Sequence, residues 1–428
     1  MKVRLTRLAL LLALSACTEQ ATAPGVCPDF CPGGQIGVVD TIFTDMIERD
    51  SAFSGYVEAA GGEVMAVADV PGAVDSRAIF RMNAMPTSIV IHDSTTSPII
   101  VDSARLQIQI LHRDTNATNL WIKLYRLPLD IDSTTTFAQV IPAFTDSIVD
   151  SVNLNTLLSA PLINDTATVR IWTVPIRTDS AGHILRVIGP DSTLFLDTYL
   201  DTAQARFVAA DSGKVAFGVR VSPDSANTIA LGTSDNGRGA RLTWFYNYLD
   251  STATVKYDSL SRGPIFDSFV FNPPTPAIDS NLAIGGAPAA RSLLRVKIPA
   301  LLRDSADVVR ATLIMIPVGP VPGAPADSFT ILARAVIADL GAKSPLSTNR
   351  DFFGTHVVHL NAVDTLRMEL TDLVRSWALD STLASALMLG QAPEGGSYTQ
   401  IRFYSTRAPA FRPTLHITFV RRYAFGAP

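Results

Sequence analysis

Short runs of alternating apolar and polar residues, separated by turn-forming residues, are the feature that most constrains the fold of this chain. The side chains of Leu106, Ile108 and Ile110 fall on one side of an extended strand, and the polar residues between them fall on the other. Similar runs occur at Leu120–Leu127, Thr168–Pro175, Lys214–Val221, Ala311–Pro317, Phe329–Ala335 and Thr414–Val420. Only Leu370–Ala378 and Leu383–Met388 have the spacing of helices. The sequence therefore predicts an all-β protein made of antiparallel, jelly-roll-like β-sandwiches.

Two passages of the first half of the chain recur in the second half, which indicates two units of similar plan. The first pair is Arg77–Met82 followed by Asp102–Leu106, and Arg291–Val296 followed by Val309–Leu313. The second pair is Val215–Val219 followed by Arg241–Tyr246, and Ala386–Gly390 followed by Gln400–Tyr404. A chain of 428 residues is too long for one small core. We therefore expect tandem modules at residues 50–257 and 264–424, joined by Asp258–Gly263.

Several passages of the second module match a known family. They are Asp267–Val270, Leu282–Gly286, Arg291–Pro299, Leu370–Trp377, Phe403–Arg407 and Arg412–Ile417. In these passages the module resembles the DNRLRE-type domains, which are secreted β-sandwich modules related to carbohydrate-binding modules. The resemblance implies a sandwich fold and says little about a ligand, since the matching motifs are structural. The first module lacks the run at 370–377 and has an additional stretch at 137–210, so we interpret it as a diverged copy.

The first residues have the composition of an export signal. Three basic residues, Lys2, Arg4 and Arg7, precede the apolar run Leu8–Leu14. This run is too short for a transmembrane helix, which needs roughly 20 apolar residues. The run ends in Leu14-Ser15-Ala16-Cys17, which resembles the lipobox of bacterial lipoproteins.

The lipobox resemblance implies that residues 1–16 are a lipoprotein signal peptide and that Cys17 receives a diacylglyceryl group. Buried acyl chains would hold the protein at a membrane that its polypeptide does not cross. The next residue is Thr18, where Asp retains such lipoproteins in the inner membrane, so we expect the cell envelope and specifically the outer membrane. The alternative is an ordinary signal peptide that contains a cysteine.

The remaining cysteines, Cys27 and Cys31, are expected to form a small disulfide loop in an oxidising compartment. A metal site is the alternative, but Asp29 is the one further candidate ligand between Cys27 and Asp40. Residues 17–49 are expected to form a flexible tether after the lipidated cysteine, because they are rich in Thr, Ala, Pro and Gly up to about residue 40.

Composition and motifs argue against several functions. The formal net charge is -4 and the basic residues are scattered, so nucleic acid is not an expected partner. The chain has no Gly-x-Ser-x-Gly, His-Glu-x-x-His or phosphate-loop motif, and His356 and His359 face opposite sides of a strand. We therefore expect no catalysis and no cofactor. The turn Asp235-Asn236-Gly237 could hold a structural calcium, or its carboxylate could simply be solvated.

Two rows of side chains are the candidate ligand-binding residues, namely Trp121, Lys123 and Tyr125 in the first row, and Trp244, Tyr246 and Tyr248 in the second. Each row lies on one face of a predicted strand, because alternate residues share a face. Aromatic rings on an exposed sheet face can stack on sugar rings. The alternative is that both rows are packed in the core or between the modules, since large aromatic side chains are usually buried.

These observations lead to one functional hypothesis with two alternatives. The hypothesis is a lipid-anchored envelope protein with non-catalytic modules that bind carbohydrate or serve in adhesion. The first alternative is a structural or assembly lipoprotein that binds another envelope protein, which a large exposed apolar patch would favour. The second is a hydrolase that acts on polysaccharide, which a pocket with paired carboxylates would favour.

Overall fold

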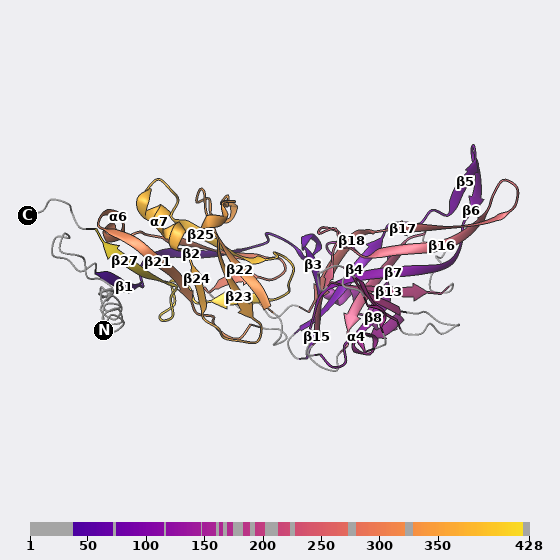
Figure 1. Ribbon diagram of the computed structural model, residues 1–428, viewed down its shortest axis with the longest axis horizontal. Helices are drawn as coiled ribbons and strands as arrows, with labels where there is room; N and C mark the ends of the chain where they lie inside the picture. Colours follow the sequence, from indigo (N-terminus) through magenta and orange to yellow (C-terminus); the bar gives the residue numbers. More distant parts are fainter. Residues whose placement is uncertain are drawn as a thin grey trace, which may run out of the picture.

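A computed structural model describes residues 37–422, except 72–73, 115–116, 147, 160–161, 166–168, 174–182, 189–192, 202–212, 223–226, 273–279 and 322–327. The fold is all-β, with antiparallel strand pairs arranged in two lobes that lie side by side (Figure 1). We call them the N-terminal module, residues 59–271, and the C-terminal module, residues 38–54 together with 282–421. In the part of the chain that the structure describes, no helix has the length and apolar character needed to span a membrane.

The N-terminal module is one strongly curled sheet with a small separate hairpin. Its strands are β3 (Val64–Val70), β4 (Val74–Met82), β5 (Ser88–His92), β6 (Thr95–Pro98), β7 (Ile100–Arg113), β8 (Trp121–Leu127), β9 (Ile148–Asn153), β10 (Leu162–Asp165), β11 (Val169–Thr173), β12 (His183–Ile188), β13 (Leu194–Leu200), β14 (Val215–Val221), β15 (Asn227–Gly232), β16 (Arg241–Leu249), β17 (Val255–Arg262) and β18 (Pro264–Phe271). Its short helices are η1 (Ala59–Gly61), α2 (Phe137–Val140), α3 (Ala143–Asp146) and α4 (Leu154–Leu158).

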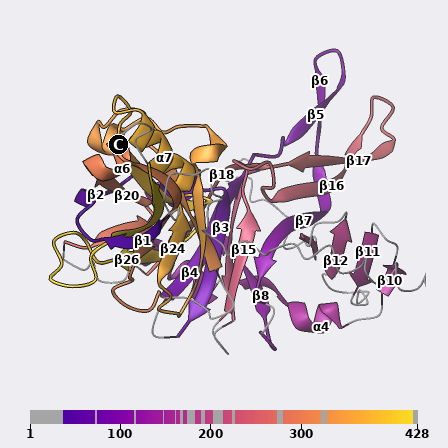
Figure 2. The ribbon, with the colours of Figure 1, turned by 60° about the vertical axis from the view of Figure 1, so that its left-hand side comes forward.

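Strands β7 and β4 organise the two sides of the N-terminal module. The long strand β7 pairs with β13, β15 and β16, and β4 pairs with β3, β14 and β18. The main core lies between these sides and contains Leu106, Ile108 and Ile110, which confirms the predicted alternation. The β5–β6 and β16–β17 hairpins project together from the end that is far from the C-terminal module (Figures 1 and 2).

The C-terminal module is a sandwich of two sheets around a second core. One sheet has the order β1-β27-β21-β24, and the other has the order β23-β22-β25-β20-β19-β26, with β2 paired to β20. The strands are β1 (Val38–Phe43), β2 (Ile47–Ser54), β19 (Leu282–Gly285), β20 (Ala290–Val296), β21 (Ala306–Met315), β22 (Ser328–Ala335), β23 (Gly354–His359), β24 (Leu366–Glu369), β25 (Ala386–Ala392), β26 (Gln400–Phe403) and β27 (Thr414–Arg421). Its helices are α6 (Ala300–Asp304), η3 (Gly341–Lys343), η4 (Arg350–Phe352) and α7 (Thr371–Leu379).

The two helix predictions in the second half have different outcomes. Helix α7 is present, and Leu373 and Trp377 on one of its sides are buried in the core of the C-terminal module. The predicted helix at 383–388 is wrong, because its last three residues begin β25. Leu387 faces the central core and Met388 faces a smaller cluster on the other side of the sheet. A strand buried on both faces is a continuous apolar run, which resembles a buried helix in sequence.

The strand pairing crosses the module boundaries expected from the sequence. Strands β1 and β2 lie within the expected tether or at its end, yet they pair with β27 and β20 of the C-terminal module. Strand β18, expected to open the second module, pairs along β4 in the N-terminal module. The C-terminal module is therefore discontinuous in sequence, and the N-terminal module lies between its two parts. Strands β1 and β27, the first and last strands among the described residues, are neighbours at one end of the molecule (Figure 1).

Candidate functional site

A polar groove of about 970 Å³ lies beside β2 in the C-terminal module; we call it the β2 groove. It contains charged side chains from β2 and the turn before it, from β20, from the loop after β22 and from the loop between β26 and β27. These are Asp45, Glu48, Arg49, Asp50, Arg295, Asp339, Arg407 and Arg412. The groove thus depends on β2, which comes from a distant part of the sequence and completes this side of the module.

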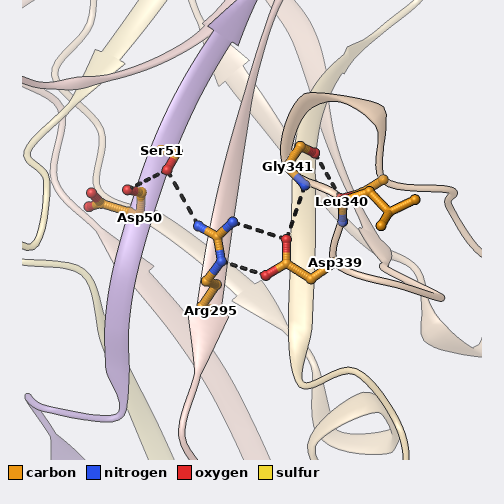
Figure 3. A network of polar contacts seen from close by, with 7 residues as sticks. Asp50, Ser51, Arg295, Asp339, Leu340 and Gly341 are labelled. Carbon is orange, nitrogen blue, oxygen red and sulfur yellow. Dashed lines mark hydrogen bonds and ion pairs between the residues drawn. The ribbon is translucent and has the colours of Figure 1, made fainter.

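The wall of the β2 groove is an ordered network centred on Arg295 (Figure 3). Its Nε and Nη2 atoms donate to the two carboxylate oxygens of Asp339 at 2.5 and 2.9 Å, and Nη1 donates to Ser51 Oγ at 3.4 Å. The backbone N–H of Gly341 donates to the same carboxylate at 3.2 Å. Because an Arg–carboxylate pair with two parallel hydrogen bonds is geometrically specific, it holds β20 and the loop after β22 in one arrangement.

Asp50 is the buried acidic residue of the groove. Its side chain is 1% exposed, and Oδ2 accepts a 2.6 Å hydrogen bond from the backbone N–H of Thr406. Oδ1 accepts no hydrogen bond among the described residues, and Arg407 Nη2 lies 3.6 Å from it. The same Arg407 nitrogen donates to Ser280 O at 3.0 Å, and its side chain is 60% exposed. Asp50 therefore holds the β26–β27 loop beside β2 and leaves Arg407 accessible at the rim.

The charges of the β2 groove balance. Four carboxylates and four guanidinium groups line it, and Glu48, Arg49 and Arg407 are exposed. Such a surface offers hydrogen-bond donors and acceptors close together without a strong field of one sign. Chemically it is suited to binding a polar, uncharged molecule.

The network gives a testable pH dependence. Hydrogen bonds from Arg295 hold the pKa of Asp339 below its ordinary value of 3.8, and the Gly341 N–H lowers it further. A carboxyl group with a depressed folded pKa stabilises the fold above its unfolded pKa, and this contribution is lost as the pH falls through the folded value. We expect Asp339→Asn to lower the free energy of unfolding by about 1 kcal/mol at neutral pH, since the pair is partly solvated. Urea unfolding should show this difference shrinking below pH 3.8; an unchanged difference would contradict it.

The structure buries most of the second predicted aromatic row. Trp244 is fully buried and Tyr246 is nearly so, both in the core of the N-terminal module, and Tyr248 packs against that core. The prediction that Trp244 and Tyr246 contact a ligand is therefore wrong, and the core alternative is correct for them. The strand β16 turns this face inward, because Leu242 and Trp244 lie in register with Leu106 and Ala104 of β7.

Short helices cover one end of the first predicted row and leave its other end uncovered. Tyr125 is buried, and its ring lies 5.0 Å from that of Phe144 in α3, so its predicted ligand contact is also wrong. Trp121 and Lys123 remain half-buried at the end of β8 that α3 does not cover. Lys123 lies beside Arg220 of β14, and Arg220 pairs with Asp69 at 3.1 Å. Sequence alternation placed these residues on one face correctly but carried no information about what covers it.

Several other predicted sites have limited or no structural information. Cys17, Cys27 and Cys31 lie outside the described residues. No group of three His, Cys, Asp or Glu residues in the described part of the chain could hold a metal ion. In the candidate calcium turn, Asn236 Oδ1 accepts from the Arg238 N–H and Asn236 Nδ2 donates to Glu63 O, so this side chain organises the turn itself.

The β2 groove was not predicted from the sequence. Its central residues Asp50, Arg295 and Asp339 are far apart in the chain, and no short motif joins them. The available signal was the predicted Arg-rich strand that contains Arg295, but its partner could not be identified without the β2–β20 pairing.

Comparison with known proteins adds no relative. The chain matches no protein-family model, and neither a curated protein nor a solved structure matches it.

Proposed function

We propose that this protein is a lipid-anchored component of the bacterial cell envelope that binds a glycan without catalysis, and that the β2 groove is the binding site. The lipid anchor and the envelope location are supported by the signal and lipobox-like residues before Cys17. The observation that carries the binding proposal is the charge-balanced groove, in which donors and acceptors are held by the Arg295–Asp339 pair and by buried Asp50.

The chemistry of the groove favours a neutral polysaccharide segment. Hydroxyl groups both donate and accept, so they can pair with carboxylates and guanidinium groups of one surface. Phe411, which directly precedes Arg412, is 57% exposed and its ring lies 5.4 Å from that of Tyr404. An exposed aromatic ring beside polar groups is suited to contact with the apolar face of a sugar ring.

The test is a glycan array followed by a polysaccharide pull-down with a soluble chain from residue 37 onward. The binding variants are Arg49→Ala and Arg407→Ala, since both side chains are exposed. We expect the double variant to bind a captured glycan at least about tenfold more weakly, because hydrogen bonds from charged groups contribute roughly 1.5–3 kcal/mol.

The matched control is Arg310→Ala, another exposed arginine of the same module that pairs with a carboxylate, Glu369, at 3.0 Å. This control should bind as the parent chain does. If no neutral glycan binds, or if the control weakens binding as much as the double variant, the groove is not a glycan site.

A second candidate function, attachment to another envelope protein, is favoured by the exposed apolar side chains on the projecting hairpins. Val90, Leu249, Val255 and Tyr257 are between 48% and 78% exposed on β5, β16 and β17. Exposed apolar patches are typical of protein contacts. A Val90→Ser, Tyr257→Ser variant that folds, still binds glycan and no longer co-purifies with a partner from the envelope would support this function.

A further inference from the structure

The strand β17 is an open edge of the sheet in the N-terminal module. Among the described residues it pairs with β16 alone, from Val255 opposite Leu249 to Arg262 opposite Leu242. Strand β16 in turn pairs with β7, so β17 lies on the side of β16 that faces away from the body of the sheet (Figures 1 and 2). Of its eight residues, Leu260 is half-buried and the others are exposed. The outer edge of β17 therefore presents backbone N–H and C=O groups that can pair with a further strand.

The hairpin that carries this edge is ordered. The Asp250 carboxylate accepts hydrogen bonds from the backbone N–H groups of Thr252 and Thr254 at 2.8 and 2.9 Å, which closes the turn between β16 and β17. The backbone N–H of Leu249 donates to Ser97 Oγ of β6 at 3.2 Å, so the neighbouring hairpin supports β16. An edge that is already ordered loses little conformational entropy when a partner binds.

One face of the sheet beside this edge is apolar and exposed. Asn247 lies in register with Ile100 of β7 and with Tyr257 of β17, and Leu249 lies in register with Val255. Because opposite residues of paired strands lie on the same face, these side chains share one face of the sheet. The four apolar side chains are all exposed, Tyr257 to 78%. Exposed apolar residues gathered beside an open edge are typical of a protein contact.

The charges of β17 make this strand complementary to itself. Lys256 and Asp258 are two residues apart and lie on the face opposite to that of Tyr257. Lys256 Nζ lies 3.6 Å from Asp250 Oδ2 of its own hairpin, and its side chain remains 52% exposed. When two copies of β17 pair antiparallel about Tyr257, Lys256 of each copy lies opposite Asp258 of the other, and the two Tyr257 side chains meet.

Other antiparallel registers are less favourable. Centres at Lys256 or Asp258 place each of these residues opposite its own copy, and a centre at Ser259 places Lys256 opposite Arg262. Like charges directly opposite each other are destabilising. A centre at Leu260 pairs Asp258 with Arg262 but leaves the exposed apolar residues of β17 outside the paired segment. The register centred on Tyr257 is the one that satisfies both the charges and the apolar face.

We propose that the projecting hairpins bind a second copy of this chain, which adds its β17 antiparallel to β17 of the first copy, centred on Tyr257. The proposal rests on the second candidate function, attachment through these hairpins, and names the partner. Pairing continues the sheet from one copy into the other and satisfies backbone groups of both edges. It also brings Val255 and Tyr257 of the two copies together. The contact is small, so the dimer forms in a concentration-dependent manner.

A single cysteine tests the register. All three cysteines of the chain precede residue 37, so Tyr257→Cys introduces the only cysteine into the chain from residue 37 onward. Opposite residues of antiparallel strands have Cα atoms about 4.5–5.5 Å apart, which is within reach of a disulfide. We expect oxidation to give a covalent dimer, visible by electrophoresis without reductant.

The matched control is Ser259→Cys, an exposed position on the same strand and face. In the Tyr257-centred register, the two copies of residue 259 are separated by about 13 Å along the strands. This variant should therefore form far less covalent dimer. Equal or greater cross-linking at residue 259 would reject the register.

Charge exchange tests the ion pairs. Self-association of the chain from residue 37 onward is measured by sedimentation velocity over a range of concentrations. Lys256→Glu and Asp258→Lys each place like charges opposite each other, so each variant alone should associate at least about tenfold more weakly than the parent. An equal mixture of the two variants should form a heterodimer with about the affinity of the parent, because opposite charges then face each other again. Restored association also shows that both variants are folded.

Two results would overturn the proposal. One is a parent chain that stays monomeric up to about 0.5 mM, and the other is a pair of charge variants that each dimerise as the parent does. A monomeric parent that still co-purifies with an envelope protein through Tyr257 would reject the second copy as partner and leave the second candidate function in place. Glycan binding at the β2 groove is not required for any of these outcomes.

Discussion

A chain that begins at residue 55 is expected to lose the folded C-terminal module, although it contains all of β19–β27. Such a chain lacks β2, which pairs with β20 from Ile47 opposite Val296 to Ser54 opposite Ala290. It also lacks Met46 and Ile47, which are buried in the core, and Asp50, which accepts from Thr406. Removing a sheet strand exposes apolar area and leaves the backbone groups of β20 unpaired, so we expect loss of cooperative unfolding in this module.

The comparison chain begins at residue 37 and retains β1 and β2. Circular dichroism and urea unfolding should show a cooperative transition for both modules in this chain and for the N-terminal module alone in the shorter one. Adding a peptide of residues 37–56 to the shorter chain should restore part of the missing transition. A chain from residue 55 that unfolds like the longer chain would show that β2 is dispensable.

Trp244→Ala is expected to lower the free energy of unfolding of the N-terminal module by about 3–5 kcal/mol. Trp244 is fully buried in the main core, on a strand in register with β7. Truncation removes the apolar area of the ring and leaves a cavity that close-packed neighbours fill only in part. The effect should appear as a lower urea midpoint without a change in the slope of the transition.

Trp121→Ala is the matched control, because it removes the same side chain from a half-buried position on β8. We expect a clearly smaller loss of stability for this variant. If Trp121→Ala and Trp244→Ala lower the free energy of unfolding by the same amount, then Trp244 is not more deeply buried than Trp121, contrary to the structure.

The local alternation of apolar and polar residues correctly indicated where several strands lie and which of their apolar side chains are buried. The predicted runs at Leu120–Leu127 and Lys214–Val221 correspond to β8 and β14, and α7 forms where helical spacing was found. Side chains return to the same face every 2 residues along a strand and every 3.6 residues along a helix, so a short stretch of sequence is enough to show either period. Alternation could not say whether Tyr125 faces solvent, because Phe144 covers it from a helix that follows in the chain.

The sequence by itself determined that this protein is all-β, that Leu106, Ile108 and Ile110 alternate into a core, and where helix α7 lies. Only the tertiary structure decided that β1 and β2 complete the C-terminal module, that β18 belongs to the N-terminal one, and that Asp50, Arg295 and Asp339 meet in one groove. The physical reason is that strand pairing joins backbones through hydrogen bonds that any residue can make. The partner of a strand is therefore chosen by how the whole set of apolar faces packs, and no local pattern records that choice.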